Sequence, residues 1–402
     1  MKKSDLFIVP EEWGNFRLET LAIHGGGLLT DTEMNPGIQR STAMPMLTDD
    51  RSRRLFSGKE AGHFYGPISN KTEECLERRL ASLHGAGAAL TLASGMTAIK
   101  TLFEYLGRNG GHIVSSSKLY GGVYDLFKKI LPAFGIETTF VENPYDLREW
   151  DEAIRKNTAA FHVEIPSNPL IDVFDGKRIA ELAHKRGIVA VADTTLGTPF
   201  LIRPFDLGFD FVGESLSKYF SDGEVWGGDI LSRSKEWMDR FRTDWYRDVR
   251  SSMSTDTADT IRANTESLGP RIEAHCFNAE MMVKYLSQHP KVKKVFYPTV
   301  GPRAEANKKL MPNGFGGLLA FEVEGGGEAA KIFVDSLKLF WLAPNIGEPR
   351  SLMLRPWVTT HNQMDSEELL KVGISEATIR FSMGREAWQN QVFDCHQAFQ
   401  KI

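Results

Sequence analysis

The stretch FDFVGESLSKYF (residues 209–220) decides the fold of this chain. Its first half is apolar and aromatic, which is typical of a strand buried in a sheet. Its second half places two serines around Leu216 and then presents Lys218. A lysine is rarely buried without a partner, so a lysine this close to a buried strand indicates a function for its amine.

Strand-like and helix-like segments alternate on both sides of this stretch. The expected strands are 88–94, 112–117, 158–166, 188–195, 209–215 and 227–232, and the expected helices include 72–84, 95–107, 120–135 and 176–187. This alternation predicts an α/β fold, with a mainly parallel sheet and helices on both of its faces. In such sheets ligands bind at the carboxyl ends of the strands.

Three parts are expected along the chain. Residues 1–60 are irregular and rich in Gly, Pro, Thr and Arg, which predicts an N-terminal extended arm. Residues 61–258 contain the alternating segments and form the large domain. Residues 259–402 begin with long helical stretches, continue with a strand at 316–326 and end in a helix, which predicts a smaller α+β domain.

Composition excludes several classes of function. The formal net charge of the 402 residues is -4, so no general basic field indicates nucleic-acid binding. No apolar run reaches the roughly 18 residues of a membrane span, and the first residues lack the apolar stretch of a signal peptide. The three cysteines form no CxxC pair, so we expect neither a disulfide framework nor a thiolate metal site. We expect a cytoplasmic location, where cysteines stay reduced.

Polar residues follow three of the expected strands. Ser94, Gly95 and Met96 open a helix, whose free N–H groups suit a phosphate. Asp193 ends a second strand, and Ser215, Ser217 and Lys218 follow a third. The serine and the aspartate would each alone indicate an ordinary cap.

Together, these residues match what pyridoxal phosphate requires. The phosphate needs N–H and hydroxyl donors, the pyridine nitrogen needs an anion, and the aldehyde needs an amine for a Schiff base. Lys218 is therefore interpreted as the lysine that carries the cofactor. Competing motifs fail, because GESLS (213–217) lacks the second glycine of a nucleophile elbow and no HExxH zinc motif occurs.

The chain resembles the Cys/Met-metabolism family of pyridoxal-phosphate enzymes, which includes cystathionine γ-synthase, cystathionine and methionine γ-lyases, and O-acylhomoserine sulfhydrylases. The similarity runs from ETLAIHGGG (19–27) to IRFSMGRE (379–386). LASGMTAI, YGGVYDLF, EIPSNPLI, VADTTLGTPF, SLSKYF and IRFSMG each resemble a motif of that family. The resemblance implies the fold of type I pyridoxal-phosphate transferases, with a seven-stranded sheet.

The resemblance also implies roles for individual residues. Tyr120 stacks on the cofactor ring and takes part in acid–base catalysis, Asn168 contacts the ring hydroxyl, and Asp193 contacts the ring nitrogen. Arg380 binds the substrate α-carboxylate, with Asn345 also assigned to substrate binding. Tyr65 belongs to a segment that enters the neighbouring subunit's site, so a homo-oligomer is expected, as a dimer or a dimer of dimers.

Three departures from the family pattern bear on the substrate and the cofactor. Pro67 stands where the family has an arginine that reaches the cofactor phosphate, and the basic run RSRR (51–54) is a candidate replacement. The segment after Lys218 is altered and contains Asp222, Glu224 and Trp226. The family's SLGG is NIGE here, which introduces Glu348.

The expected reaction is γ-elimination on a methionine-like or O-substituted homoserine amino acid. Three alternatives stay open: γ-replacement with O-acylhomoserine, γ-elimination on a cationic substrate such as canavanine, and a catalytically silent binding protein. The acidic residues favour the cationic substrate only if they face the site, since they also fit solvated loops. The intact set of Lys218, Asp193, Tyr120 and Arg380 argues against the silent protein.

Overall fold

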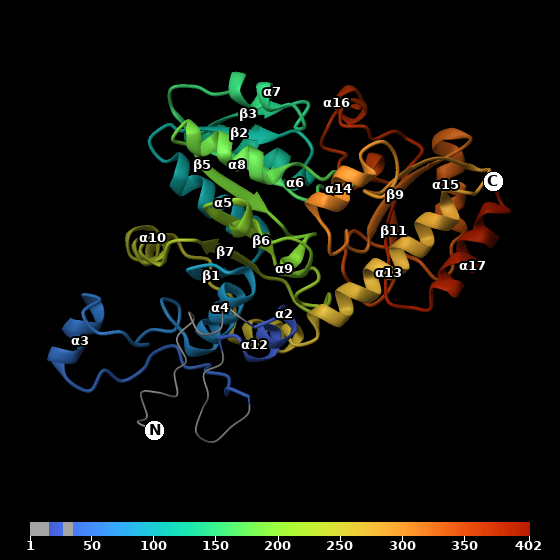
Figure 1. Ribbon diagram of the computed structural model, residues 1–402. Coiled ribbons are helices and arrows are strands. Elements are labelled where there is room, and N and C mark those ends of the chain that lie inside the picture. Colours follow the sequence, from blue (N-terminus) through green and yellow to red (C-terminus); the bar gives the residue numbers. More distant parts are fainter. Residues whose placement is uncertain (1–15, 27–34) are drawn as a thin grey trace.

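A seven-stranded sheet forms the centre of the larger part of the molecule (Figure 1). The computed structural model describes residues 16–26 and 35–402. The strands lie in the order β1-β7-β6-β5-β4-β2-β3. Their bounds are β1 Ala88–Leu92, β2 His112–Ser116, β3 Glu137–Val141, β4 Thr158–Glu164, β5 Val189–Asp193, β6 Phe211–Ser215 and β7 Gly228–Ser232. β7 runs antiparallel to its neighbours β1 and β6, and the other neighbouring pairs are parallel.

Helices connect and cover these strands. α5 packs on β6 and β7, α8 packs on β4 and β5, and α4 packs on β1. The bounds in this part are α4 Lys71–His84, α5 Gly95–Gly107, α6 Gly121–Asp125, α7 Leu147–Glu152, α8 Gly176–Lys185, α9 Thr198–Leu201, α10 Lys235–Phe241 and α11 Arg247–Val249. The Asn70 side chain caps α4, and Gly85 ends it with a φ of 69°, a conformation that favours glycine.

A second, five-stranded sheet follows in the order β10-β11-β12-β9-β8. α13 and α15 pack on this sheet, and α17 packs on both helices. The strands are β8 Val292–Phe296, β9 Leu318–Val323, β10 Trp341–Leu342, β11 Leu352–Leu354 and β12 Thr378–Ser382. The helices of this part are α13 Leu268–Leu286, α14 Ala304–Leu310, α15 Gly326–Ser336, α16 Ser366–Lys371 and α17 Trp388–Phe399. α12 Thr255–Thr265 packs instead on α4 of the large part, and the expected domain boundary at 258/259 lies within it.

The predicted fold class is confirmed: a mainly parallel sheet with helices is joined to a smaller part that has its own sheet. One strand of the large sheet was missed. β3 has the sequence ETTFV and lies at the edge of that sheet, where most of its residues are only partly buried, so it lacks the apolar run of its neighbours.

The first 60 residues contain two short helices in the part that the structure describes. They are α2 Leu18–His24 and α3 Asp49–Phe56, and α3 projects from the body of the molecule in Figure 1. Residues 1–15 and 27–34 of the predicted arm lie outside the described residues.

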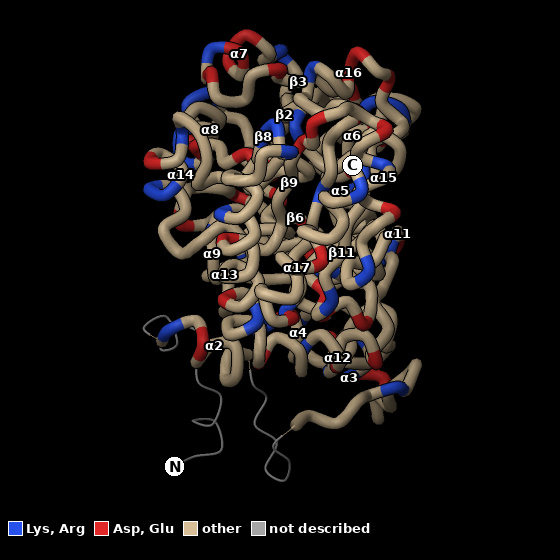
Figure 2. Tube along the Cα trace, turned by 90° about the vertical axis from the view of Figure 1, so that its right-hand side faces the viewer, with Lys and Arg blue, Asp and Glu red and all other residues tan. Residues whose placement is uncertain are grey.

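The surface carries charges of both signs. Figure 2 shows that Lys and Arg positions alternate with Asp and Glu positions along the Cα trace, without a large block of one sign. Within residues 16–26 and 35–402, no helix has the length and apolar character that crossing a membrane requires.

Candidate active site

The site is built at the carboxyl ends of three neighbouring strands. β4 ends at Glu164, β5 at Asp193 and β6 at Ser215. Glu164 and Asp193 are register partners, and β5 and β6 run parallel, so these side chains meet at one edge of the sheet. The structure thus places these three predicted strand ends next to one another.

Ser94, Gly95 and Ser215 converge at the start of α5. The Ser94 side chain caps α5 by accepting a hydrogen bond from the Thr97 N–H at 3.2 Å. A Cβ added at Gly95 would lie 2.5 Å from the Ser215 Cβ, so only glycine leaves room there. The result is a narrow polar cradle at a helix N-terminus, the arrangement that suits a phosphate.

Ser217 holds the chain that follows β6. Its hydroxyl donates to the Gly227 carbonyl at 3.1 Å and accepts from the Gly227 N–H at 3.0 Å. These two hydrogen bonds join the start and the end of the connection between β6 and β7, and Lys218 lies within that connection.

The Lys218 amine is largely buried and joins a hydrogen-bond chain. Its Nζ donates to the Asn345 Oδ1 at 2.7 Å, and the Asn345 Nδ2 donates to Glu348 Oε1 at 2.7 Å. The pKa of Lys218 is lowered to about 8, mainly by burial and also by the Arg380 charge, while the Glu348 charge opposes this change. A lysine with this pKa has a much larger neutral fraction near neutral pH than an ordinary lysine, and a nucleophile or a base needs the neutral form.

Asp193 is a buried carboxylate at the end of β5. Its Oδ1 accepts a hydrogen bond from the Thr195 N–H at 2.9 Å, and the Thr195 hydroxyl accepts from the Ser215 N–H at 2.9 Å. Burial raises the pKa of Asp193 to about 6, with Thr195 opposing and Glu214 adding to the shift. A nearby cation would favour the charged carboxylate, and a protonated pyridine ring is such a cation.

Arg380 presents a guanidinium that the fold buries almost completely. Nη1 donates to the Asn168 Oδ1 and Nη2 to the Asn345 carbonyl, both at 3.2 Å. Its buried Nε has no hydrogen-bond partner among the described residues, and burial lowers the pKa of Arg380 to about 10. A fixed, incompletely paired guanidinium is suited to a carboxylate.

Tyr120 and Asn168 are positioned by one carboxylate that the sequence analysis did not identify. The buried Glu164 accepts hydrogen bonds from the Tyr120 N–H and from the Asn168 N–H, both at 2.7 Å. Burial raises the pKa of Glu164 well above its usual range. The position of Glu164 at the end of a buried strand was the sequence signal that could have identified it.

The Tyr120 ring lies toward α5 and stays partly exposed. A Cβ added at Gly122 would contact the Tyr120 ring at 2.6 Å and the Met96 sulfur at 3.3 Å. The ring and the thioether therefore flank the same glycine, which brings Met96, the third residue of the predicted phosphate segment, next to Tyr120.

The three acidic residues of the altered segments have different environments. Asp222 accepts from Arg385 at 2.6 Å and lies 3.4 Å from the Arg271 guanidinium, so it is already paired. Glu224 is exposed, as is Trp226. Glu348 alone of the three reaches Lys218, through Asn345.

Tyr65 lies in the segment that precedes α4. It forms a β-bridge with Ala43, and the Arg250 guanidinium lies over its ring. The Tyr65 side chain is partly exposed.

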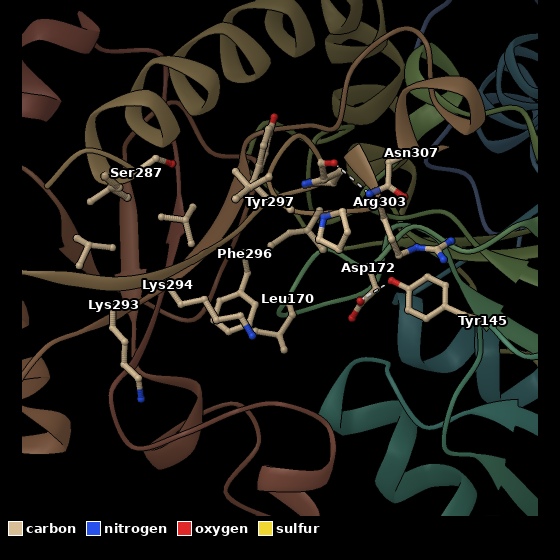
Figure 3. Close-up of a pocket in the computed structure, with 18 residues that line it drawn as sticks. Tyr145, Leu170, Asp172, Ser287, Lys293, Lys294, Phe296, Tyr297, Arg303 and Asn307 are labelled. Carbon is tan, nitrogen blue, oxygen red and sulfur yellow. Dashed lines mark hydrogen bonds between the residues drawn. The ribbon is translucent and has the colours of Figure 1, made fainter. Parts of the chain in front are cut away.

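A separate pocket of about 540 Å³ lies between β8 and the loop at residues 170–172 (Figure 3). Tyr145, Asp172 and Arg303 lie at one end, where the Tyr145 hydroxyl donates to Asp172 at 2.6 Å. Its lining contains none of the residues of the Lys218 site. This pocket is therefore distinct from the Lys218 site.

The residues at the strand edge fit pyridoxal phosphate. The cradle at α5 is too narrow for a side chain at Gly95, Asp193 is a buried carboxylate, and Lys218 is a buried amine of low pKa. Fold and donor set together define a pyridoxal-phosphate-dependent enzyme of fold type I.

The chain belongs to the family described as Cys/Met metabolism PLP-dependent enzyme, whose model matches residues 19–400. An O-acetyl-L-homoserine sulfhydrylase of Corynebacterium glutamicum is 32% identical and an L-methionine gamma-lyase of Fusobacterium nucleatum is 34% identical. The first alignment covers 98% of both chains, and the second covers 97% of this chain and 100% of the lyase.

A crystal structure from Campylobacter jejuni, assigned as an O-acetylhomoserine (thiol)-lyase, has a TM-score of 0.92 and 34% identity. The match covers 96% of this chain and 100% of that one, which contains pyridoxyl-lysine monophosphate. The predicted family and the predicted cofactor, pyridoxal 5'-phosphate, are both confirmed.

Proposed function

We propose that this enzyme catalyses γ-elimination on a methionine-like or O-substituted homoserine amino acid. The products are a 2-oxo acid, ammonia and the γ-leaving group. The observation that supports the proposal is the position of Asn345, whose Oδ1 accepts from the Lys218 amine and whose carbonyl accepts from the Arg380 guanidinium, so that the amine and the guanidinium lie side by side.

Arg380 and Asn168 orient the substrate. The guanidinium binds the α-carboxylate, and the hydrogen bond from Arg380 Nη1 to Asn168 Oδ1 fixes the plane of the fork. Binding at this point places the α-carbon on the side of the site where the Lys218 amine lies. A buried arginine suits this role because the surroundings of its guanidinium fix its direction.

Lys218 and Tyr120 move the protons. The bound cofactor withdraws electrons from the α-carbon and makes its hydrogen acidic. Lys218 removes that proton in its neutral form and returns protons at the neighbouring carbons. The Tyr120 hydroxyl assists departure of the γ-group, while Asp193 holds the positive charge of the ring nitrogen.

Assays of 2-oxobutyrate release test elimination directly. With methionine or O-acetylhomoserine alone, we expect stoichiometric release of the 2-oxo acid, because water completes the reaction. Added thiol should change this rate by less than about twofold if elimination dominates. If 2-oxo acid forms only slowly and added thiol is instead consumed into a new thioether, γ-replacement is the activity. The sulfhydrylase relative supports that second candidate.

A cationic substrate is the third candidate, and Glu348 is the observation that favours it. Glu348 is half-buried and linked to Lys218, whereas Asp222 is engaged by Arg271 and Arg385. A carboxylate can bind a guanidinium through two parallel hydrogen bonds. The leaving group of canavanine would place such a guanidinium beyond the γ-position.

Glu348→Gln should lower kcat/KM for canavanine about 10- to 100-fold, the effect expected for loss of a charge-assisted hydrogen bond. Methionine and cystathionine should change by less than about threefold, because glutamine still accepts the hydrogen bond from Asn345. Glu224→Gln is the matched control on an exposed loop. If kcat/KM falls equally for all substrates, Glu348 acts only by positioning Lys218 and does not recognise the cationic group.

The remaining proposals concern assembly. Tyr65 lies far in sequence from Ser94 and Ser217, and the family resemblance implies that its segment enters a neighbouring copy. We therefore propose at least a dimer. We also propose that each copy consists of an arm (1–60), a cofactor domain (61–258) and a C-terminal domain (259–402). Light scattering of the active holoenzyme tests this, and a fully active monomer would exclude it.

A further inference from the structure

The cofactor phosphate lacks one expected cationic partner in this chain, because Pro67 occupies the place of an arginine. The basic run at 51–54 does not replace it in this structure. Arg51 and Arg54 pair with the two oxygens of Glu60 at 2.9 and 3.0 Å, and Arg53 pairs with Asp49 at 2.9 Å. These guanidinium groups already have carboxylate partners.

The guanidinium of Arg250 has different surroundings. Its guanidinium carbon lies 5.5 Å from the centre of the Tyr65 ring. Its Nη1 is buried and has no hydrogen-bond partner within the described part of the chain, and no carboxylate there forms an ion pair with it. A buried cationic donor without an acceptor is costly unless something absent from the chain itself supplies one.

The backbone next to Arg250 connects the phosphate cradle to the Pro67 segment. The Ser251 carbonyl accepts a hydrogen bond from the Ala93 N–H at 2.9 Å, immediately before Ser94. The Ser252 hydroxyl donates to the Pro67 carbonyl at 3.0 Å. Arg250 thus begins a segment that touches both the start of α5 and the position from which the arginine is missing.

We propose that Arg250 supplies the guanidinium that binds the cofactor phosphate. The phosphate offers oxygens to the planar fork of the arginine, and the α5 N-terminus offers N–H groups from the other side. The Tyr65 ring beneath the guanidinium keeps its plane in place through a cation–π contact. Proline at position 67 then removes no essential charge, because the charge comes from a different segment.

Titration of the apoenzyme with two cofactor forms tests this assignment. Arg250→Met should raise the Kd of pyridoxal phosphate about 10- to 100-fold and leave the Kd of pyridoxal, which lacks the phosphate, unchanged. The readouts are the visible absorbance of the lysine-bound form and the thermal shift on binding. Arg51→Met is the control and should change neither Kd. The titration detects the guanidinium whichever copy of the chain supplies it.

A rescue variant makes the test stricter. Arg250→Met combined with Pro67→Arg should recover affinity for pyridoxal phosphate, because it restores a guanidinium beside Tyr65. If Arg250→Met does not fold, Arg250→Lys takes its place and should still weaken pyridoxal phosphate selectively, since lysine lacks the fork. An unchanged Kd for pyridoxal phosphate, or an equal loss for both forms, would overturn the proposal.

Discussion

Lys218→Ala is expected to lower turnover by on the order of 10³-fold or more and to remove the visible absorbance of the lysine-bound cofactor. Proton transfer by a positioned side chain alone typically contributes 10²–10⁴-fold, and Lys218 also provides the covalent attachment. Steady-state kinetics and an absorbance spectrum of the purified variant measure the two effects.

The control is Lys235→Ala, which removes an exposed lysine paired with Asp239. It should retain both activity and absorbance. A Lys218→Ala variant that keeps near-normal turnover would move the catalytic amine to another residue and remove the basis of the proposed mechanism.

The same lysine gives a pH dependence with a defined sign. Only the neutral amine attacks the cofactor aldehyde, and burial lowers the pKa of Lys218 to about 8. Attachment of the cofactor to the apoenzyme should therefore accelerate as pH rises and level off above about 8. Glu348→Gln should shift this midpoint to lower pH, because it removes the charge that stabilises the ammonium. Stopped-flow absorbance measures the rate. A midpoint near the ordinary lysine value of about 10.4 would contradict the effect of burial.

Asp193→Asn should lower kcat by on the order of 10²–10³-fold, the loss typical when one preorganised charge is removed from an active site. The pKa of Asp193 is about 6 before any cation is bound, so the carboxylate is charged at the pH of most assays. Asparagine keeps the size and can accept from the Thr195 N–H, but it supplies no charge to the ring nitrogen. Steady-state kinetics at saturating cofactor separates this effect from weaker cofactor binding.

Asp210→Asn is a matched control, since Asp210 immediately precedes β6 and so lies at the amino-terminal end of the strand that ends at Ser215. It accepts from the Ala190 N–H at 2.8 Å and lies far along the strand from Ser215. Its substitution should leave kcat within about twofold. If the two variants lose the same activity, Asp193 acts through the stability of the sheet rather than through its charge.

The residues at the strand ends could be selected from the sequence because their signals are local. Ser94, Asp193 and Lys218 each follow an apolar run within a few positions, and parallel strands carry such ends to one edge. β3 was missed for the converse reason, since an edge strand with the polar sequence ETTFV needs little apolar content. The antiparallel direction of β7 also depends on its neighbours rather than on its own residues.

Local sequence patterns could not predict contacts between segments that are distant along the chain. The hydrogen bond from Lys218 to Asn345 joins residues 127 positions apart, and no periodicity encodes it. The family resemblance supplied Asn345 as a site residue but not this contact. The Arg250 environment depends on three segments meeting, so it too required the structure. The basic run at 51–54 was a poorer candidate because Glu60 pairs with two of its arginines and Asp49 with the third.

The chain of contacts from Lys218 to Glu348 crosses between the two sheets. Lys218 follows β6 of the large sheet, whereas Asn345 and Glu348 lie between β10 and β11 of the second sheet. The charges that act on the Lys218 amine, those of Arg380 and Glu348, therefore come from the part of the chain that carries the second sheet. The polar cradle and Asp193 belong to the first sheet. A substitution in the second part can then change the pH at which the amine becomes neutral without altering any residue of the strand ends that suit the cofactor.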